Sequence, residues 1–436
     1  MSTLPGGTGV ADVVVVGGGI TGIQAALDLA NHGVKVHLVE REPTIGGHMA
    51  MLDKTFPTND CSMCILSPKM VDVERHPLVT LHTCTEVVGV EGEVGDFTVR
   101  LLRHPRYIDE KECNGCGDCT EVCPVEVYNR FDAGIGVRKA VYKPMPQAVP
   151  NITVRDAEHC IDCGLCYEAC GKDAVLRDDE DHEEELEVHA AAVVITTGYA
   201  TFDPSRKPNL RYLQLPDVVT NLEFERMINA SGPTKGELRR LSNGAVPESI
   251  AFLQCVGSRD MQIDRPYCSC VCCMAAVKNA ILIKEHHPKT EVTVLYMDLR
   301  AYGKGYEEYF ERAKAIGVRF LRGMPGEIAA RDGGLELMVE DTETEEVEYL
   351  HPDLVVLSVG MQPSAGAEEL AERLGITLEP TGFVHIKDEK MNTVSTLRPG
   401  IYVAGTAVAP KDIPDCVAMA GAAAMRAYQD TRKVGA

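Results

Sequence analysis

Short apolar runs that end at glycine recur along the chain and predict buried parallel strands. The first run, Val13–Val16, is followed by a glycine-rich turn, by helical periodicity over Ile23–His32 and by a second apolar run, Val34–Val39. Runs without an alternating polar face are typical of strands that helices cover on both sides. The pattern therefore predicts an α/β fold that begins with strand, glycine turn, helix and strand.

Further elements of the same kind follow. We expect strands at 191–195, 249–254, 292–297, 353–360 and 400–405, and helices at 275–285, 306–316 and 417–427. The acidic run Asp178–Glu187 is expected to be a solvated loop. The order of the elements predicts two nucleotide-type α/β units.

The first glycine turn carries candidate nucleotide chemistry. Gly17, Gly19 and Gly22 fit the G-x-G-x-x-G pattern between a strand and a helix, and Glu40 ends the second strand. Glycines let the backbone approach a pyrophosphate at a helix N-terminus, and the acid can accept ribose hydroxyls. A packing turn is the alternative, but the complete context favours a dinucleotide site.

Composition and charge narrow the chemistry. The chain has 436 residues, enough for roughly two to four domains. Its net charge of −22 argues against a nucleic-acid partner, because phosphates would be repelled. Met1–Ala11 carries no basic leader region, and no apolar stretch approaches the ~20 residues of a membrane span, so we expect a cytoplasmic protein. Since disulfides are rare there, the 17 cysteines point to metal or redox chemistry.

Eight cysteines form two copies of one spacing, C-x2-C-x2-C-x3-C. The copies are Cys113, Cys116, Cys119 and Cys123, then Cys160, Cys163, Cys166 and Cys170. This is the bacterial ferredoxin run, in which the fourth cysteine of each copy ligates the other 4Fe–4S cluster. One cluster is thus expected on Cys113, Cys116, Cys119 and Cys170, and the other on Cys160, Cys163, Cys166 and Cys123. The alternative, a pair of zinc ribbons, needs C-x2-C pairs separated by a long gap.

A second group of cysteines follows the strand at 249–254. Its members are Cys255, Cys268, Cys270, Cys272 and Cys273. Thiolates are soft ligands that suit iron–sulfur clusters, and four are enough for a cubane, but spacing alone does not choose them. Buried structural or redox thiols are the alternative.

The remaining cysteines leave one pair open. The alternatives for Cys61 and Cys64 are a redox dithiol, a structural pair, and half of a metal site that Cys84 or another chain completes. Cys84, Cys270 and Cys416 are expected to be small buried side chains.

Several segments resemble the two-dinucleotide-binding flavoproteins. Gly46–Gly47 resembles their second glycine pair, Thr197–Gly198 the end of the strand that rejoins the FAD sheet, and Gly405–Thr406 their last FAD-contacting strand. This resemblance implies FAD rather than NAD at the first site and places a ferredoxin module inside the FAD-binding domain. The FAD-binding residues would be Gly17, Gly19, Ile20, Thr21, Gly22, Glu40, Arg41, Gly46, Gly47, Thr197, Gly198, Gly405, Thr406 and Ile413.

The chain as a whole closely resembles the family of heterodisulfide reductase A subunits. The matching segments are 59–69, 106–110, 131–139, 254–259, 267–274 and 410–415. The resemblance implies a thioredoxin-reductase-like α/β flavoprotein with an inserted bacterial-type ferredoxin domain that holds two 4Fe–4S clusters. It implies a third cluster in place of the NAD site, on Cys255, Cys268, Cys272 and Cys273. It also places Lys278 near flavin N5, although the bare sequence favours a solvated helix lysine.

The same resemblance implies a domain plan. The FAD-binding domain would comprise 1–104, 181–246 and 363–436, the ferredoxin domain 105–180, and a degenerate NAD-like domain 247–362. Longer members carry an extra N-terminal domain and a C-terminal ferredoxin module, which this chain is expected to lack. Cys61 and Cys64 would then be ligands only of a cluster shared with a partner chain.

The family's chemistry is flavin-based electron bifurcation between a two-electron donor, ferredoxin and a disulfide such as that of coenzymes M and B. The implied partners are the B and C subunits of heterodisulfide reductase, ferredoxin, and an electron-input iron–sulfur protein of a hydrogenase or dehydrogenase, in a dimer of hetero-oligomers. The second unit lacks phosphate-binding glycines, so we expect no direct NAD(P)H binding. The alternatives are a non-bifurcating conduit in a sulfur- or quinone-linked complex, and a scaffold with structural clusters.

Overall fold

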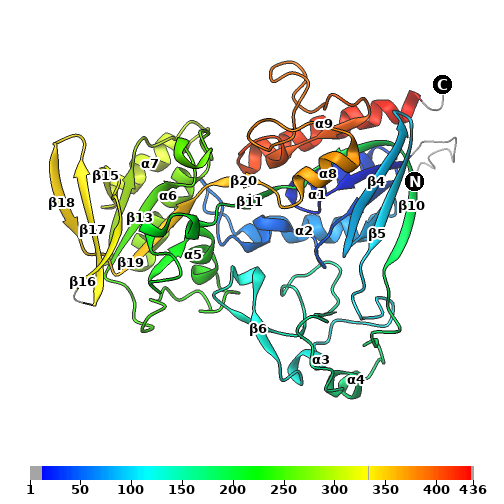
Figure 1. The fold of residues 1–436 in the computed structure, drawn as a ribbon, viewed down its shortest axis with the longest axis horizontal. Coiled ribbons are helices and arrows are strands. Elements are labelled where there is room, and N and C mark those ends of the chain that lie inside the picture. The colour runs from blue at the N-terminus through cyan, green and yellow to red at the C-terminus, as the bar shows by residue number, and fades with distance from the viewer. Residues whose placement is uncertain (1–11, 332, 434–436) are drawn as a thin grey trace, which may run out of the picture.

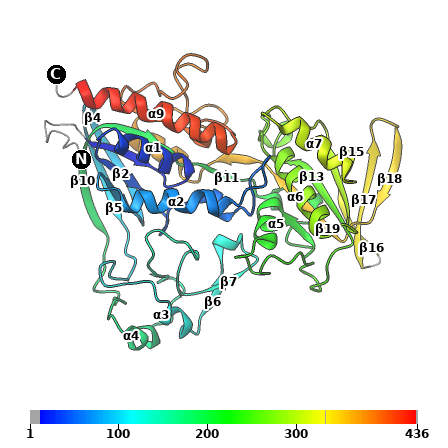
Figure 2. The same cartoon turned by 180° about the vertical axis from the view of Figure 1, so that it is seen from behind.

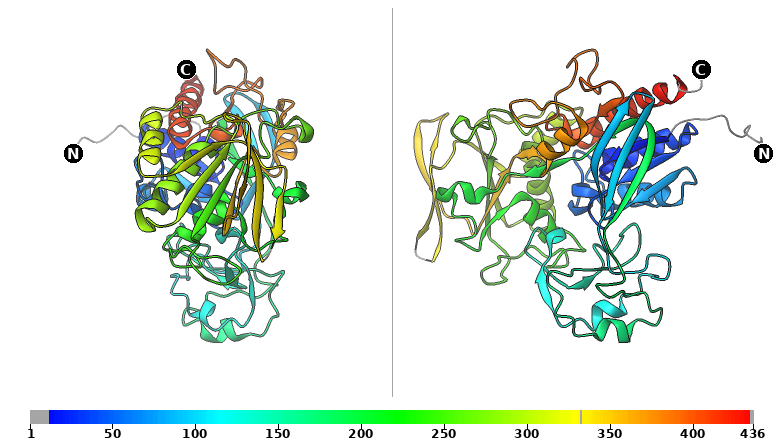
Figure 3. Two further views of the ribbon diagram at one scale, coloured as in Figure 1. Left: turned by 90° about the vertical axis from the view of Figure 1, so that its left-hand side faces the viewer. Right: turned by 45° about the vertical axis from the view of Figure 1, so that its right-hand side comes forward.

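The computed structural model describes residues 12–331 and 333–433, so Met1–Ala11, predicted to carry no leader, lie outside the described residues. Two α/β units stand side by side, and a smaller module hangs below them (Figure 1). The right-hand view of Figure 3 shows the same arrangement from another side. Among the described residues, no helix combines the length and the apolar character that crossing a bilayer requires.

The first unit is built on a seven-stranded sheet in the order β3-β2-β1-β10-β5-β4, with β21 beside β10. Its strands are β1 (Asp12–Val16), β2 (Val36–Val39), β3 (Val79–His82), β4 (Thr85–Glu93), β5 (Asp96–Arg103), β10 (Glu184–Ile195) and β21 (Ile401–Val403). The strands β1, β2, β3, β10 and β21 are parallel to one another, whereas β5 runs antiparallel to both of its neighbours, β10 and β4.

Helices cover both faces of this sheet. On one face lie α1 (Ile20–Asn31), α2 (Ser62–Arg75) and α9 (Ile413–Lys433) (Figure 2), and α8 (Ala367–Leu374) packs on the other. Val13 and Val15 join the core under α1 and α9, while Val14 and Val16 join the core on the other face. Burial on both faces explains why this strand is apolar at every position after Asp12.

The third module is inserted between β5 and β10, and we call this segment the insert. Since β5 and β10 are antiparallel neighbours, both ends of the insert leave the sheet side by side. The second half of the acidic run, expected to be a solvated loop, is instead the start of β10, where Glu184 lies opposite Arg103 and Glu187 opposite Arg100. These acids are exposed, as expected, but the segment is a strand rather than a loop because it pairs with β5.

The insert contains little regular structure. Its elements are α3 (Asp118–Glu121), β6 (Glu126–Tyr128), η2 (Arg130–Asp132), β7 (Val137–Lys139), β8 (Val141–Tyr142), β9 (Val154–Arg155) and α4 (Leu165–Ala169). The insert is anchored by Val149, whose carbonyl accepts a hydrogen bond of 3.0 Å from Ile45 N, and by Asp132, which pairs with the fully buried Arg226 at 3.0 Å.

The second unit is built on a five-stranded parallel sheet in the order β12-β19-β13-β14-β15. Its strands are β12 (Val218–Thr220), β13 (Ser249–Val256), β14 (Glu291–Tyr296), β15 (Arg319–Arg322) and β19 (Leu354–Val359), and its helices are α5 (Asn221–Ile228), α6 (Cys272–His286) and α7 (Tyr306–Ala315). An antiparallel sheet of β16 (Ile328–Arg331), β17 (Gly334–Asp341) and β18 (Glu346–Leu350) packs beside it.

The chain crosses between the units in a two-stranded ribbon, β11 (Tyr199–Thr201) with β20 (Met361–Pro363). Because β12 pairs with β19, residues 218–228 lie with the second unit, although the predicted boundary at 246/247 puts them in the FAD-binding domain. The remaining short helices are η1 (Gly47–Met51), η3 (Pro204–Arg206), η4 (Pro208–Leu210), η5 (Met261–Ile263) and η6 (Gly405–Ala407).

Candidate cofactor sites

The predicted nucleotide-binding residues gather at one edge of the first sheet. The parallel strands β1, β2, β10 and β21 end there, and they are followed by Gly17, Glu40, Thr196–Gly198 and Gly405. The carboxyl edge of such a sheet is where α/β proteins bind their ligands. Ile20, Thr21 and Ile413 lie in the first turns of α1 and α9.

The glycines of the first turn allow neighbouring backbone segments to approach closely. Gly17 has φ +110°, and a Cβ on it would lie 2.4 Å from the carbonyl oxygen of Thr196. A Cβ on Gly22 would lie 1.8 Å from the carbonyl oxygen of Gly17, so β1 and α1 touch here. A Cβ on Gly19, the N-cap of α1, would meet no heavy atom within 4 Å. This open space at the helix N-terminus fits a pyrophosphate.

Glu40 faces the same turn. Its carboxylate accepts hydrogen bonds from Gly18 N at 2.6 Å and from Glu42 N at 2.9 Å. Burial raises the pKa of Glu40, and these two backbone donors oppose the rise. A carboxylate offers about four lone-pair positions, so capacity remains for a ribose hydroxyl. The neighbouring Arg41 points away, because its Nη1 donates to Ala365 O at 2.9 Å.

The second glycine pair, Gly46–Gly47, is hydrogen-bonded to the first glycine turn. Gly46 N donates to Gly18 O at 2.8 Å, and both Gly46 and Gly47 have positive φ. The next residue, His48, stacks on Tyr199 with ring centroids 4.3 Å apart. Burial lowers the pKa of His48 to about 4 and raises that of Tyr199, so this pair is neutral. Neither residue was predicted from the sequence, in which the only signal is that each directly follows a predicted glycine.

The turn after β21 closes the same edge. Gly405 has φ +70°, and a Cβ on it would lie 2.5 Å from Thr21 Oγ1. Thr406, also buried, follows in η6. Gly198 likewise has a positive φ, next to Thr197. The structure thus brings every predicted FAD residue except the outward-pointing Arg41 to this edge or to the helix ends beside it.

Lys278 is buried, at 2% exposure, rather than solvated. Its ammonium group pairs with Glu225 and donates to Lys54 O at 3.0 Å. Glu225 Oε2 also accepts from Asp53 N at 3.1 Å. Since Asp53 and Lys54 follow η1 of the first unit while Lys278 and Glu225 lie on α6 and α5 of the second, the hydrogen bonds from Lys278 to Lys54 O and from Asp53 N to Glu225 join the two units. Glu225 carried no sequence signal.

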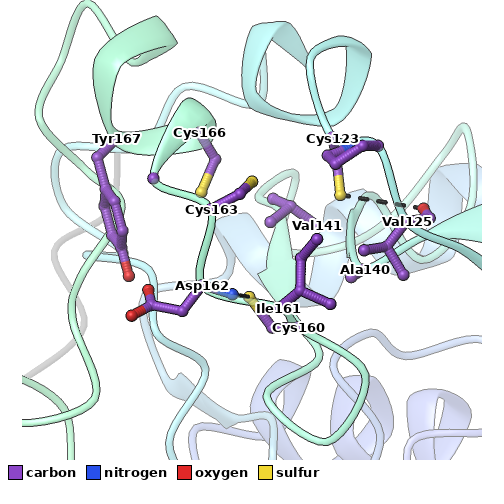
Figure 4. A pocket seen from close by; sticks show the side chains of 12 residues that line it. Cys123, Val125, Ala140, Val141, Cys160, Ile161, Asp162, Cys163, Cys166 and Tyr167 are labelled. Atoms are coloured by element: carbon purple, nitrogen blue, oxygen red, sulfur yellow. Dashed lines mark hydrogen bonds between the residues drawn. The ribbon is translucent and has the colours of Figure 1, made fainter.

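Two cavities in the insert are each lined by four cysteines. Figure 4 shows the cavity lined by Cys123, Cys160, Cys163 and Cys166. The other is lined by Cys113, Cys116, Cys119 and Cys170. In each cavity three cysteines come from one half of the insert and the fourth from the other half. Four thiols around one cavity fit a 4Fe–4S cubane.

The third cysteine group surrounds the first turn of α6. Cys272 and Cys273 begin this helix and are 5% exposed, while Cys255 is the second-last residue of β13. Burial raises the pKa of Cys255 to about 11, and the neighbouring thiols Cys273 and Cys268 add to the rise. Hydrogen bonding from Cys270 lowers the pKa of Cys268 to about 6. Cys270 is only half-buried and lies against Cys268, contrary to the expectation of a buried bystander.

The structure joins Cys61 and Cys64 in a disulfide at the N-terminus of α2. Of the open alternatives, this is the oxidised form of a dithiol, and a ligand role would require its reduction first. Cys84 and Cys416 are buried, at 8% and 5% exposure, as expected.

Comparisons with protein families agree with this division of the chain. The family models of an FAD dependent oxidoreductase, a 4Fe-4S dicluster domain and a pyridine nucleotide-disulphide oxidoreductase match residues 12–59, 112–175 and 267–424. The predicted fold class, an α/β flavoprotein with an inserted iron–sulfur domain, is confirmed, as are the cofactor types FAD and 4Fe–4S.

Curated relatives match nearly the whole chain. The chain is 51% identical over 416 residues to the A subunit of the H(2):CoB-CoM heterodisulfide,ferredoxin reductase of Methanothermobacter marburgensis, covering 95% of this chain and 63% of that one. It is 53% identical over 418 residues to an iron-sulfur A subunit of the CoB–CoM heterodisulfide reductase of Methanopyrus kandleri, with the same coverage. The A subunit of the Ferredoxin:CoB-CoM heterodisulfide reductase of Methanosarcina mazei is 46% identical and is covered to 53%. The chain therefore spans between half and two thirds of the length of these relatives.

Solved structures share the fold. Lactococcus lactis thioredoxin reductase matches with a TM-score of 0.52 at 18% identity, over 97% of this chain and 99% of that one. The thioredoxin reductase of T. acidophilum matches with a TM-score of 0.51 at 14% identity and the same coverage.

Proposed function

Because this chain belongs to the family of heterodisulfide reductase A subunits over 95% of its own length, we propose that it is the FAD- and iron–sulfur-bearing electron-transfer subunit of a heterodisulfide-reductase-type complex. The observation that carries the proposal is the pair of four-cysteine cavities in a module inserted beside a dinucleotide-type sheet edge. When bound, FAD exchanges electron pairs with a donor and single electrons with iron–sulfur clusters.

The residues at the sheet edge divide the task of holding FAD. The glycine turn and the N-terminus of α1 bind the pyrophosphate through backbone N–H groups, and Glu40 binds the ribose. The N-terminus of α9 lies beside η6 and favours negative charge there. Lys278, fixed by Glu225 and Lys54 O, is the catalytic residue that we place near flavin N5, on the family resemblance.

The cysteines supply three cluster sites. The two cavities of the insert hold one cluster each, on the ligand sets that line them. Cys255, Cys268, Cys272 and Cys273 hold the third, where the first turn of α6 offers unpaired backbone N–H groups to the thiolates. Cys270 remains outside this set because its thiol is committed to Cys268 O at 3.6 Å.

The complete complex bifurcates electrons in this proposal. The chain serves as the hub between a two-electron donor, ferredoxin and a disulfide of the coenzyme M–coenzyme B type. It does so in a cytoplasmic dimer of hetero-oligomers with B and C subunits and a hydrogenase- or dehydrogenase-linked input protein. The name of the M. marburgensis relative includes hydrogen, the heterodisulfide and ferredoxin. A non-bifurcating conduit is the second candidate, because the M. mazei name gives ferredoxin and the heterodisulfide alone.

Electron counting in the reconstituted complex tests the proposal. The chain is loaded anaerobically with iron, sulfide and FAD, and combined with the B and C subunits, the input protein and ferredoxin. We expect about twelve irons per flavin, four for each cubane, and equal numbers of electrons reaching ferredoxin and the disulfide. Disulfide reduction that consumes reduced ferredoxin would support the conduit. Full activity without this chain, or loaded clusters that stay oxidised, would overturn both candidates.

A further inference from the structure

Arg259 lies among the cysteines of the third cluster site, and nothing in the proposed ligand set uses it. It follows Cys255 by four residues in the turn after β13, and its backbone N donates to Tyr267 O at 2.9 Å. Because Tyr267 directly precedes Cys268, this bond closes a loop whose two ends lie next to the proposed ligands Cys255 and Cys268. Arg259 itself has a positive φ of 55°, so its side chain leaves the loop in a direction that ordinary backbone does not provide.

The guanidinium group of Arg259 lies between the Asp298 carboxylate and the Cys255 thiol. Its Nη2 donates to Asp298 Oδ2 at 2.7 Å. Its other terminal nitrogen, Nη1, is buried and has no hydrogen-bond partner in the described part of the chain. A buried guanidinium N–H without a partner loses its hydration without compensation. Nη1 is therefore the atom that can donate a hydrogen bond to a bound group.

The ion pair with Asp298 places the guanidinium group beside the cysteines. The Sγ of Cys273 lies 3.9 Å from the carbonyl oxygen of Asp298, the residue that pairs with Arg259. Along the chain, Arg259 stands four residues after Cys255, and its backbone N–H is bound to the residue before Cys268. One cation is therefore close to three of the four proposed ligands, which come from two segments of the chain.

We propose that Arg259 sets the reduction potential of the third cluster by donating its free N–H to the cluster's sulfur atoms and by placing a positive charge beside them, with Asp298 as its positioning residue. This inference rests on the proposed function, because it needs the cluster at Cys255, Cys268, Cys272 and Cys273. A cubane with four thiolates is anionic, and reduction adds one more negative charge. A cation and an N–H donor at the sulfur atoms stabilise the reduced form and so raise the potential.

A second arginine provides a matched control. Arg300 also lies near Cys268 and Cys273, but its side chain is exposed, so water and salt screen its charge. Replacing either arginine by glutamine removes one positive charge from the same neighbourhood. Only the replacement of Arg259 also removes a buried donor.

The experiment is a redox titration of the cofactor-loaded chain, followed by EPR. The signal of the third cluster is identified as the one that the double variant C255A/C268A loses. We expect R259Q to keep FAD and the insert clusters and to shift this signal to a more negative potential than R300Q does. Selective loss of this cluster from R259Q, with normal loading of R300Q, would also support the proposal, because the anionic cluster would lack its counter-charge.

Equal potentials and equal loading in R259Q and R300Q would overturn the inference while leaving the cluster itself in place. If C255A/C268A removes neither iron nor any signal from the wild-type pattern, the third cluster of the proposed function fails as well. Should R259Q not fold, R259K is measured in its place, since it keeps the charge but lacks the planar fork. A potential below that of the wild type then supports the role of the donor, and a wild-type potential overturns it.

Discussion

Gly19 and Gly22 occupy the same turn but have different surroundings, and this difference predicts different outcomes of the same substitution. In G22A the new methyl group would lie 1.8 Å from Gly17 O, so the turn between β1 and α1 must rearrange and FAD is lost. In G19A the methyl group meets no protein atom within 4 Å but enters the space that we assign to the pyrophosphate. We expect G19A to fold and to bind FAD at least about tenfold more weakly, or about 1.4 kcal/mol.

Fluorescence titration of the apoprotein with FAD measures both variants. G326A is the control, because Gly326 is exposed, has an ordinary backbone conformation and also has open space at its Cβ. Wild-type affinity in G19A would show that the phosphates bind elsewhere.

The Lys278–Glu225 ion pair predicts a stability effect that is separate from catalysis. Both side chains are almost fully buried, so K278M or E225Q alone leaves an uncompensated partner and is expected to cost about 3–5 kcal/mol of unfolding free energy. The double variant K278M/E225Q should cost much less than the sum of the two. Chemical denaturation of the FAD-free protein measures this cycle, with the exposed Lys289 as control in K289M. Additive costs would contradict the direct pairing.

Residue burial is the property that the sequence could not provide here. Lys278 reads as a solvated helix residue because its partner is 53 positions away on α5, and no local pattern connects them. His48 and Tyr199 are likewise paired across more than a hundred residues. The glycines of the first turn could be recognised because strand, turn and helix are contiguous in the chain, and only the identity of the bound nucleotide needed the family resemblance.

At the scale of elements, the insert predicts crossed dependence of its two cavities on single cysteines. Cys123 belongs to the first half of the insert but lines the cavity of Cys160, Cys163 and Cys166, and Cys170 lines the opposite one. We expect C123A to remove the cluster that C163A removes, and C170A the one that C116A removes, with a loss of about four irons each. Iron analysis and EPR of the four variants test this. If C123A and C116A abolish the same signal, the ligand sets are not crossed.

The start of β10 shows how an element escapes a prediction from composition. Glu184 and Glu187 read as a solvated run, but each faces an arginine of β5, and the buried Asp181 accepts from Arg106 N and Tyr107 N at 2.8 Å each. The two ends of the insert therefore meet in an ordered stem. Strand pairing between residues about 80 positions apart is a tertiary property that no local pattern shows. The neighbouring hairpin of β4 and β5 was also not predicted.

For the whole molecule, the apolar runs predicted the strands β1, β2, β10, β13, β14, β19 and β21, because burial on two faces leaves a strong sequence signal. The runs missed β3, β12 and β15, the parallel strands at the edges of the two sheets. They did not predict the antiparallel sheet β16–β18, in which Met338, Val347 and Tyr349 remain exposed, so that its pattern is diluted. They also missed the early crossing at β11, since three residues of an isolated ribbon carry little hydrophobic pattern. The position of each unit along the chain follows from the sequence, whereas the exact crossing points depend on which strands pair.

The second sheet predicts how the whole molecule responds to nicotinamide nucleotides. In a dinucleotide unit the turn after the first strand holds the phosphates, but here a Cβ on Gly257 would lie 2.1 Å from the ring of Phe202. Phe202, at 1% exposure, fills this turn from the segment after β11, and the cysteine group occupies the start of α6. We therefore expect millimolar NADH or NADPH to leave the FAD absorbance of the cluster-loaded chain unchanged under anaerobic conditions.

Dithionite, which needs no binding site, is the positive control and should bleach the flavin. Rapid bleaching by NADH would mean that a nucleotide reaches the flavin by a route that does not use this turn, and electron entry through a partner protein would then be unnecessary.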